Sequence, residues 1–205
     1  MKVLVTGNLG YIGSVLTNKL QQQGYSVVGY DIGYYSDCIT SECKPPNVQI
    51  KKDLRKIDEN EVEGVDYIIH LASLSNDPLG AFMPNLTEEI NYESTIKLAE
   101  YAKKQKVKRF IFASTQSIYG ISKTDSELKE DSSFKDPITA YAKTKWKAEQ
   151  EIMEMATDNF CVSALRPSTV FGPSPRFRAD IVFNNLVACA FTSKKIEIWS
   201  DGSPW

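Results

Sequence analysis

The feature that most constrains the fold is a glycine-spaced turn close to the amino terminus. An apolar run at residues 3–6 leads into Gly7, Gly10 and Gly13, and residues 11–23 follow with helical spacing. Glycine at the first position permits a turn that a Cβ forbids. At the second it lets a ligand approach the backbone, and at the third it lets the helix pack against the strand. Because a helix amino terminus offers unpaired N–H groups and partial positive charge, we expect this unit to bind the pyrophosphate of a dinucleotide.

The next expected strand, residues 26–30, runs into an acidic residue. Asp31 lies 18 positions after Gly13, close to the spacing of about 20 expected for the acid that binds the ribose hydroxyls. A carboxylate at this position repels a 2′-phosphate, which favours NAD over NADP as the cofactor. The alternative role for Asp31 is that of a solvated turn residue.

Apolar runs and helical segments alternate along the rest of the chain. The further expected strands are residues 67–70, 109–113 and 162–165, and the further expected helices are residues 87–104 and 137–156. Strands alternating with helices indicate a parallel sheet covered on both faces, and strands that are apolar throughout suit that environment. The sequence therefore predicts an α/β fold with a Rossmann-type doubly wound parallel sheet.

Two helix starts carry local signals. Asp136 followed by Pro137 offers a capping carboxylate and a proline at the first helical position. Thr87 precedes Glu88 and Glu89, which places negative charge in the first turn, where the helix dipole favours it. We expect helices to begin at both places.

The character of the chain changes after Arg166, where prolines crowd an irregular segment. A helix is expected at residues 180–191 and a short strand at 196–199, and the chain then stops within what looks like a continuing domain. We therefore divide it into an NAD-binding Rossmann domain, residues 1–166, and the start of a truncated substrate-binding region, residues 167–205. On this division the C-terminal substrate lobe is mostly missing.

The composition excludes several classes of partner. A net charge of −2 gives no electrostatic reason to expect nucleic acid or an anionic membrane. A single histidine, and cysteines with no Cys-x-x-Cys spacing, give no metal site. We expect reduced thiols, with a Cys38–Cys43 disulfide as the alternative. With no signal-type segment and no apolar run long enough for a bilayer, the sequence predicts a soluble, cytoplasmic protein.

Tyr141 and Lys145 form the first candidate catalytic pair. Residues four apart share a helix face, so both project together from the helix expected at residues 137–156. A lysine cation beside a phenol lowers the tyrosine pKa from its usual value of about 10 toward the range useful for acid–base chemistry near neutral pH. The alternative is a stacked aromatic ring with a solvated lysine.

Three motifs together resemble the extended branch of the short-chain dehydrogenase/reductase superfamily. They are the Gly-x-x-Gly-x-x-Gly loop, Tyr141-x-x-x-Lys145 and the strand-end segment that finishes in Tyr119-Gly120. The resemblance runs along the whole chain and is closest to the NAD-dependent epimerase/dehydratase family, whose members act on nucleotide sugars. Alignment on Tyr119-Gly120 places Thr115 at the family's catalytic serine or threonine. Ser114 is the neighbouring alternative, and a strand-end cap is the structural alternative for either residue.

The resemblance also implies two sets of binding residues and no metal ligand. The cofactor set is Gly7, Gly10, Tyr11, Ile12, Gly13, Asp31, Ile32, Asp53, Leu54, Leu71, Ala72, Ser73, Asn91, Ser114, Tyr141, Lys145 and Pro167. The substrate set is Ser75, Thr115, Tyr141 and Thr169. Within the cofactor set, Asp53 and Leu54 match the pair that contacts adenine, and Asn91 matches an asparagine that steadies the cofactor side. His70 is expected to be a hydrogen-bonded core histidine rather than a catalyst.

Two departures from the family pattern bear on the reaction. Members that eliminate water at C4–C6 carry an Asp-Glu pair after the catalytic threonine, where this chain has Gln116 and Ser117. Neither side chain can serve as the acid or base, which counts against a 4,6-dehydratase and equally against a decarboxylase that needs a carboxylate there. Thr169 stands where the family often has asparagine. Residues 75–78 are expected near the active-site mouth, with an Asp-Pro turn as the alternative.

The resemblance implies an NAD-dependent nucleotide-sugar epimerase that acts by transient oxidation at sugar C4, with Tyr141 as base assisted by Lys145 and Thr115. Two alternatives remain. One is an NAD(P)-dependent keto-sugar reductase or dehydrogenase, and the other is a non-catalytic NAD-binding module, because the chain is truncated. The expected partner is a nucleotide-sugar substrate. The resemblance further implies a homodimer formed by pairing residues 87–104 and 137–156 across two chains.

Overall fold

The fold is built on one sheet of six parallel strands. The computed structural model describes residues 1–75, 77–121 and 127–201. The strand order is β3-β2-β1-β4-β5-β6, and each neighbouring pair is parallel. The strands are β1 Lys2–Thr6, β2 Ser26–Asp31, β3 Val48–Lys51, β4 Tyr67–His70, β5 Arg109–Ala113 and β6 Cys161–Leu165. The predicted Rossmann-type parallel sheet is therefore confirmed.

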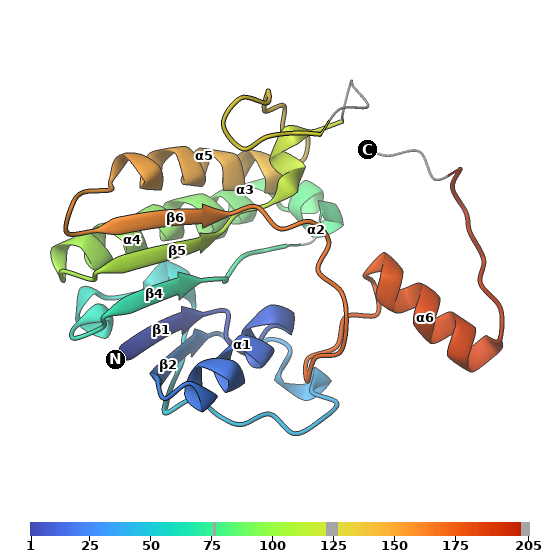
Figure 1. Ribbon diagram of the computed structural model, residues 1–205, viewed down its shortest axis with the longest axis horizontal. Helices are drawn as coiled ribbons and strands as arrows, with labels where there is room; N and C mark the ends of the chain where they lie inside the picture. Colours follow the sequence, from blue (N-terminus) through green and yellow to red (C-terminus); the bar gives the residue numbers. More distant parts are fainter. Residues whose placement is uncertain (76, 122–126, 202–205) are drawn as a thin grey trace.

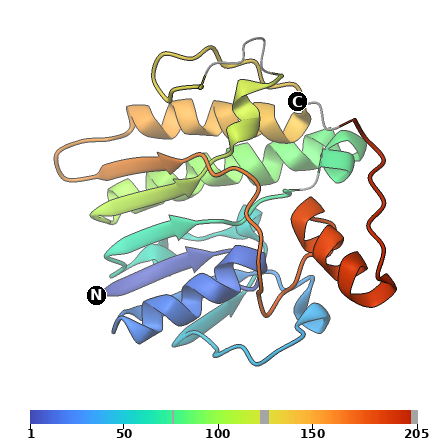
Figure 2. The same ribbon diagram turned by 45° about the vertical axis from the view of Figure 1, so that its right-hand side comes forward.

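Helices cover both faces of the sheet (Figures 1 and 2). The α-helices are α1 Tyr11–Gln22, α2 Asp77–Phe82, α3 Pro84–Glu88, α4 Ser94–Lys104, α5 Ala140–Glu154 and α6 Val182–Ser193. The 3-10 turns are η1 Ser36–Cys38, η2 Leu54–Lys56, η3 Glu59–Val62 and η5 Gln116–Tyr119, and η4 Glu89–Glu93 is a π-helical turn. In the part of the chain that the structure describes, no helix is long and apolar enough to cross a membrane. The four cysteines are free thiols.

The two faces of the sheet bury two separate cores, because successive strand side chains point to opposite sides. In β1, Leu4 belongs to the larger core, which contains Leu98 of α4 and Ile152 of α5. Its neighbours Val3 and Val5 belong to the smaller core, which packs against α1. β1 is therefore buried on both of its faces, which is the reason for its uninterrupted apolar sequence.

One strand was missing from the expectations. β3 pairs with the outer edge of β2, with Asp31 opposite Lys51. Its sequence carries no run of buried apolar residues, because only Ile50 is partly buried and packs against the larger core. An edge strand with so little burial leaves no periodic signal in the sequence.

The predicted start of α5 at Asp136-Pro137 is wrong. The helix begins at Ala140, and Thr139 caps it by accepting a hydrogen bond from the Ala142 N–H at 3.1 Å. The backbone of Asp136 is used elsewhere, because its N–H donates to the Ile118 carbonyl at 3.0 Å. A pairing with a distant segment has therefore overridden the local capping signal.

The predicted helix start at Thr87 is also wrong. α3 begins three residues earlier, at Pro84, and Thr87 lies inside it with its hydroxyl donating to the Met83 carbonyl at 3.0 Å. The predicted continuous helix over residues 87–104 is interrupted by the π turn η4 before α4 begins. Such turns insert a residue into a helix and often lie at functional sites.

At the carboxyl end the helix expected at residues 180–191 is present as α6, shifted by two residues. The strand expected at residues 196–199 is wrong, because no strand forms there within the described chain. Ile196, Ile198 and Trp199 are exposed. An alternating apolar pattern makes a strand only where a partner strand supplies hydrogen bonds, and the described residues place none beside it.

His70 confirms the expected role as a satisfied core residue. It is fully buried, and its ring stacks on Phe112 with centroids 5.7 Å apart. Its Nδ1 lies 2.6 Å from the Thr6 hydroxyl and its Nε2 lies 2.8 Å from the Thr95 hydroxyl. Because Thr95 donates its own proton to the Asn91 carbonyl, its oxygen must accept from Nε2–H, which assigns the neutral tautomer with Nδ1 accepting.

The protonation of His70 predicts how the stability of the protein depends on pH. No other histidine contributes, because His70 is the one histidine of this sequence. Burial, and then the charge of Lys145, lower its pKa to about 3. The unfolded chain, with a histidine pKa of about 6.5, binds the extra proton first, so stability is lost as the pH falls below 6.5. We expect a slope of up to about 1.4 kcal/mol per pH unit between pH 6.5 and 5.

Urea unfolding at several pH values measures this slope. A His70→Gln variant should lack the histidine contribution whatever its absolute stability. Equal slopes in both proteins over this range would show that His70 titrates normally in the fold.

Candidate functional site

The candidate residues gather at the carboxyl edge of the sheet. β1 leads into the glycine loop, β2 ends at Asp31, β4 leads into residues 71–75, and β5 leads into Ser114 and Thr115 (Figure 1). Between β1 and β4 the strand order reverses direction, since β2 and β3 lie on one side and β5 and β6 on the other. Ligands of open α/β sheets bind in the crevice at such a switch point.

The glycine loop has the geometry that its sequence indicates. Gly7 adopts a φ of +72° and donates its N–H to the Tyr30 carbonyl at 2.8 Å. A Cβ on Gly13 would overlap the Gly7 carbonyl, so α1 could not approach β1 this closely. A Cβ on Gly10 would meet only the Gly7 carbonyl, 3.2 Å away, which leaves the remaining space beside it open. The loop is therefore tight on its protein side and accessible on the other.

The amino terminus of α1 is left for a ligand to cap. Gly10 is the N-cap and supplies no side-chain cap. The first intrahelical bond runs from the Ser14 N–H to the Gly10 carbonyl at 3.0 Å. The N–H groups of Tyr11, Ile12 and Gly13 are therefore those that an α-helix cannot satisfy internally, and they make an anion site.

An amide pair that sequence reasoning missed braces the loop. Asn8 is buried, and its amide donates to Gln49 Oε1 at 2.7 Å and accepts from Gln49 Nε2 at 3.3 Å. The pair ties the loop to β3 across β2. A Cβ on Gly29 of β2 would overlap the Asn8 side chain, so that glycine makes room for it. Only the fold brings these three residues together.

Asp31 is fixed by two backbone donors. Its carboxylate accepts from the Leu9 N–H at 3.1 Å and from the Gly33 N–H at 2.8 Å. These bonds hold the acid at the end of β2, beside the glycine loop, which is where a ribose acid is required. Neighbouring Ile32 is half-buried at the same strand end.

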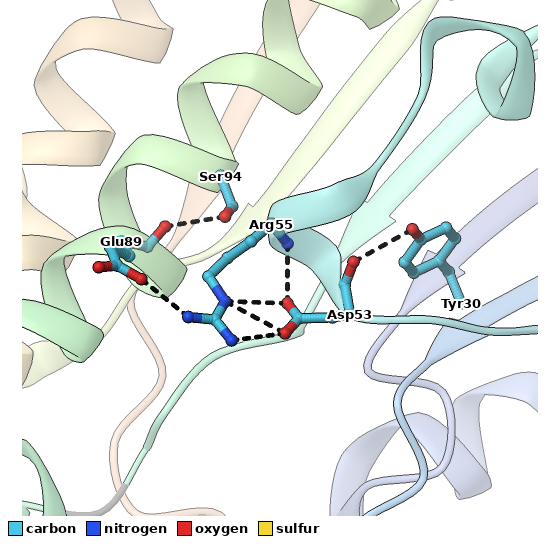
Figure 3. Close-up of polar contacts among 5 residues, drawn as sticks. All are labelled: Tyr30, Asp53, Arg55, Glu89 and Ser94. Carbon is cyan, nitrogen blue, oxygen red and sulfur yellow. Dashed lines mark hydrogen bonds and ion pairs between the residues drawn. The ribbon is translucent and has the colours of Figure 1, made fainter.

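Asp53 lies beyond β3 and is held by an ion-pair network (Figure 3). Arg55 binds its carboxylate through Nε and Nη2, the latter at 2.7 Å, and extends Nη1 to Glu89 at 2.8 Å. The hydrogen bonds from Arg55 lower the pKa of Asp53, so it is ionised at neutral pH and can accept from an amino group. The next residue, Leu54, is only 6% exposed and belongs to the larger core.

The segment after β4 is bonded to the end of β1, just before the glycine loop. The N–H groups of Leu71 and Ala72 donate to the carbonyl and hydroxyl of Thr6, at 3.1 and 3.2 Å. Asn91, buried in the π turn η4, accepts from the Leu74 N–H at 2.8 Å and donates to the Leu74 carbonyl at 3.1 Å. The asparagine therefore steadies the backbone at the end of β4.

Two buried hydroxyls support the fit of a polar ligand at this edge. The Oγ atoms of Ser73 and Ser114 are buried and have no hydrogen-bond partner among the described residues. Ser73 follows β4, which borders the switch point, and Ser114 follows β5, which pairs with β4. Since buried polar atoms are nearly always satisfied, these two are suited to bonds with a bound group. Together with the open space at Gly10 and the uncapped end of α1, they fit a dinucleotide.

Thr115 begins the short turn after β5. It is 7% exposed, and its hydroxyl oxygen accepts from the Ser117 N–H at 3.1 Å, so it caps η5. The next residue, Gln116, donates its N–H to the Pro167 carbonyl at 3.2 Å. The strand-end cap that was the structural alternative for Thr115 is therefore present, and it also fixes where the hydroxyl lies.

Tyr141 and Lys145 lie on successive turns of α5, as their spacing predicts. Lys145 is 2% exposed, and its Nζ donates to the Ala113 carbonyl at 2.9 Å. The ammonium lies 6.0 Å from the centre of the Tyr141 ring and 4.6 Å from that of Phe112. Burial lowers the pKa of Lys145 to about 7. The solvated lysine of the alternative interpretation is thus wrong, since the amine is enclosed beside β5.

A second ion pair that sequence reasoning missed anchors α5. Arg166 follows β6, and its Nη2 binds Glu149 of α5 at 2.5 Å, with both side chains largely buried. Its Nη1 reaches the Tyr119 hydroxyl at 2.7 Å. Arg166 thereby joins α5, the helix of Tyr141, to η5, the turn that follows Thr115. Arginine before proline carries no pattern that identifies its partner.

The two remaining substrate candidates are exposed residues in segments that follow strands. Ser75 and Thr169 are exposed, one after β4 and the other after β6. Asn76, which belongs to the segment expected at the active-site mouth, lies outside the described residues. No group of metal-ligating side chains occurs in the described part of the chain.

The sheet order, the glycine loop and the uncapped helix end define a Rossmann-type dinucleotide-binding protein. The family model described as NAD dependent epimerase/dehydratase family matches residues 3–205. The chain belongs to this family, within the extended short-chain dehydrogenase/reductase superfamily.

Similar proteins are longer than this chain. A Bacillus subtilis (strain 168) protein named uncharacterized UDP-glucose epimerase YtcB is 30% identical, over 98% of this chain and 66% of its own length. The UDP-glucose 4-epimerase of the same organism is 32% identical, over 87% of this chain and 55% of its own. This chain thus spans about two thirds of the length of the first relative and about half of the second.

Solved structures superimpose along nearly the whole chain. MoeE5 in complex with UDP-glucose and NAD gives a TM-score of 0.82 at 28% identity, covering 98% of this chain and 65% of that one. UDP-N-acetylglucosamine 4-epimerase from Methanobrevibacter ruminantium M1, in complex with UDP-N-acetylmuramic acid, gives 0.83 at 28% identity, covering 98% and 66%.

The Asn8–Gln49 brace predicts how the loop responds to substitution. In Gly29→Ala the new methyl group displaces the Asn8 amide, and we expect the dissociation constant for NAD to rise about tenfold, equivalent to roughly one hydrogen bond. Asn8→Ala removes the obstacle, so Gly29→Ala should have little further effect in that background. Calorimetric titration of the two single variants and the double variant measures this coupling. Additive losses would mean that the brace does not shape the loop.

Proposed function

We propose that this protein is an NAD-dependent nucleotide-sugar epimerase that acts by transient oxidation at sugar C4. The observation that carries the proposal is the placement of Tyr141 beside the enclosed amine of Lys145, at the sheet edge that also holds the glycine loop. Family membership and the names of the similar proteins support the substrate class. Residues 1–166 serve as the NAD-binding domain, and residues 167–205 begin the substrate-binding region.

NAD is the cofactor that the edge residues suit. The uncapped N–H groups of α1 would bind its pyrophosphate, Asp31 its adenosine ribose, and Asp53 its adenine amino group. Ser73 and Ser114 offer two otherwise unsatisfied hydroxyls to it. When bound, NAD supplies a hydride acceptor for the sugar carbon and a hydride donor for the resulting ketone.

The residues of the protein would handle the proton. Tyr141, as a phenolate, accepts the proton of the C4 hydroxyl and later returns it as a phenol. Lys145 stabilises the phenolate by charge, which is strengthened because the amine is shielded from water. The hydroxyl of Thr115 orients the reacting oxygen and relays the proton to Tyr141. Its position is held by the bond with the Ser117 N–H.

The residues after Thr115 argue against elimination. Gln116 and Ser117 are confined to the short turn η5, where their backbone N–H groups bond to Pro167 and Thr115. Neither side chain can carry the negative charge of a general base. A dehydratase or a carboxylate-dependent decarboxylase is therefore disfavoured, whereas the proposed epimerase uses Tyr141, Lys145, Thr115 and the cofactor and needs no carboxylate at these positions.

Two other functions use the same residues differently. A keto-sugar reductase or dehydrogenase would consume or produce reduced cofactor, whereas an epimerase returns it unchanged. A binding module without turnover would have no need of Thr115, Tyr141 and Lys145 together. The proposed partner of the protein is a nucleotide sugar, and pairing of the α4 and α5 sides across a homodimer is part of the proposal.

A panel of substrates distinguishes these functions. The complete protein is incubated with NAD and with UDP-, GDP-, dTDP- and CDP-sugars, and the products are followed by NMR. We expect inversion at C4 with no net formation of NADH. Net cofactor turnover would support the reductase or dehydrogenase instead. Tight NAD binding with no product from any sugar would overturn both enzyme proposals.

Substitution of the tyrosine tests the mechanism. Tyr141→Phe removes the proton acceptor and should lower kcat by about 10²- to 10⁴-fold, the range for loss of general acid–base catalysis. NAD affinity should change little. Tyr25→Phe, a tyrosine packed against the core under α1, is the matched control and should keep full activity. Activity of Tyr141→Phe near the wild-type level would remove Tyr141 from the mechanism.

A further inference from the structure

The segment after β6 crosses the site and contacts the cofactor loop. Figures 1 and 2 show it passing along the carboxyl ends of the strands, from β6 to the level of α1. We call residues 172–178 the strap. The Pro175 carbonyl accepts from the Thr40 N–H at 2.8 Å, in the loop after β2. The Ser174 hydroxyl donates to the Tyr11 carbonyl at 2.7 Å and lies 3.1 Å from the Ser14 hydroxyl.

Tyr11 takes part in most of the hydrogen bonds between this segment and α1. Its hydroxyl donates to the Gly172 carbonyl at 2.6 Å and lies within 3.1 Å of the Asn184 amide, which donates to it. Asn184 in turn accepts from the Gly172 N–H at 2.9 Å and donates to the Arg178 carbonyl at 3.0 Å. Tyr11, Gly172 and Asn184 therefore form a closed ring of hydrogen bonds.

The ring is shielded and joins distant parts of the chain. Asn184 is only 6% exposed, so its amide depends on these protein partners. It lies in the first turn of α6, whereas Tyr11 is the first residue of α1. Much of the apolar surface of α6 is exposed, including Val182, Val187 and Phe191. The Tyr11 hydroxyl is thus a direct link between the first turn of α6 and the start of α1.

Tyr11 connects the proposed cofactor site at the start of α1 with the ring that holds α6. Its backbone N–H is one of the uncapped donors at the start of α1, and its side chain ends in the ring with Asn184. Phosphate oxygens bound at the helix terminus would restrain the Tyr11 backbone, and the rigid phenol would pass that restraint to Gly172 and Asn184. A phenylalanine would fill the same space without making either bond.

We propose that Tyr11 is a positioning residue that couples dinucleotide binding at α1 to the ordering of the strap and α6. The inference rests on the proposed function for the identity of the dinucleotide. Its consequence is that a bound cofactor further stabilises the order of the substrate-binding region. Coupling of this kind between two sites is commonly about 5- to 150-fold in affinity.

Hydrogen–deuterium exchange of the complete protein, with and without NAD, tests the proposal. In the wild type, NAD should slow exchange both in the glycine loop, residues 7–14, and in the first turns of α6. In Tyr11→Phe, protection of the glycine loop should persist, whereas protection of α6 should fall to the level without NAD. Tyr25→Phe should behave as the wild type.

Each other outcome has a distinct meaning. Equal protection of α6 in wild type and Tyr11→Phe overturns the inference, and so does a wild-type α6 that NAD leaves unprotected. Absence of protection in the glycine loop of the wild type would instead contradict the proposed cofactor. Asn184→Ala removes the other half of the ring and should reproduce the Tyr11→Phe result. Thermal unfolding of every variant confirms that each is folded.

Discussion

A buried chain of hydrogen bonds through His70 holds the carboxyl edge of the sheet together. It runs from the Ala72 N–H to the Thr6 hydroxyl, through the histidine ring to Thr95 and on to Asn91. Asn91 then binds both backbone groups of Leu74. This chain of hydrogen bonds links β1, β4, η4 and the segment after β4. Their relative positions therefore do not require a ligand. The ring must stay neutral for the chain to be satisfied, and burial ensures that it does.

The sequence predicted the parts of the fold that are decided locally. The five strands that were expected have runs rich in apolar residues, and the glycine loop carries its own geometry in three residues. Failures occur where a distant partner decides. β3 has too little burial to leave a pattern, and Asp136 lost its expected capping role because its backbone pairs with Ile118. The apolar residues 196–199 had a strand-like pattern, but the described chain offers them no strand to pair with.

The same division applies to the candidate site. Motifs located Tyr141 and Lys145, because a helical repeat of four residues is enough to place them together. The supports of the site were not predictable in this way. The Asn8–Gln49 amide pair, the Arg166–Glu149 ion pair and the ring around Tyr11 join residues that are far apart in sequence. Each side chain alone resembles an ordinary polar residue, and only the crossing of strands and strap gives it a partner.

The enclosure of Lys145 shows why these supports matter to the proposed chemistry. Burial lowers the pKa of Lys145 to about 7, while a phenolate at Tyr141, with its ring centre 6.0 Å from the amine, would raise it again. In the proposed mechanism, a phenolate at Tyr141 would therefore favour a proton on the amine. A solvated lysine would keep its charge at all relevant pH values and respond little to its neighbour. The bond to the Ala113 carbonyl holds the amine in its buried position, and the Arg166–Glu149 ion pair anchors α5, so the surrounding fold is what makes the charge of Lys145 responsive near neutral pH.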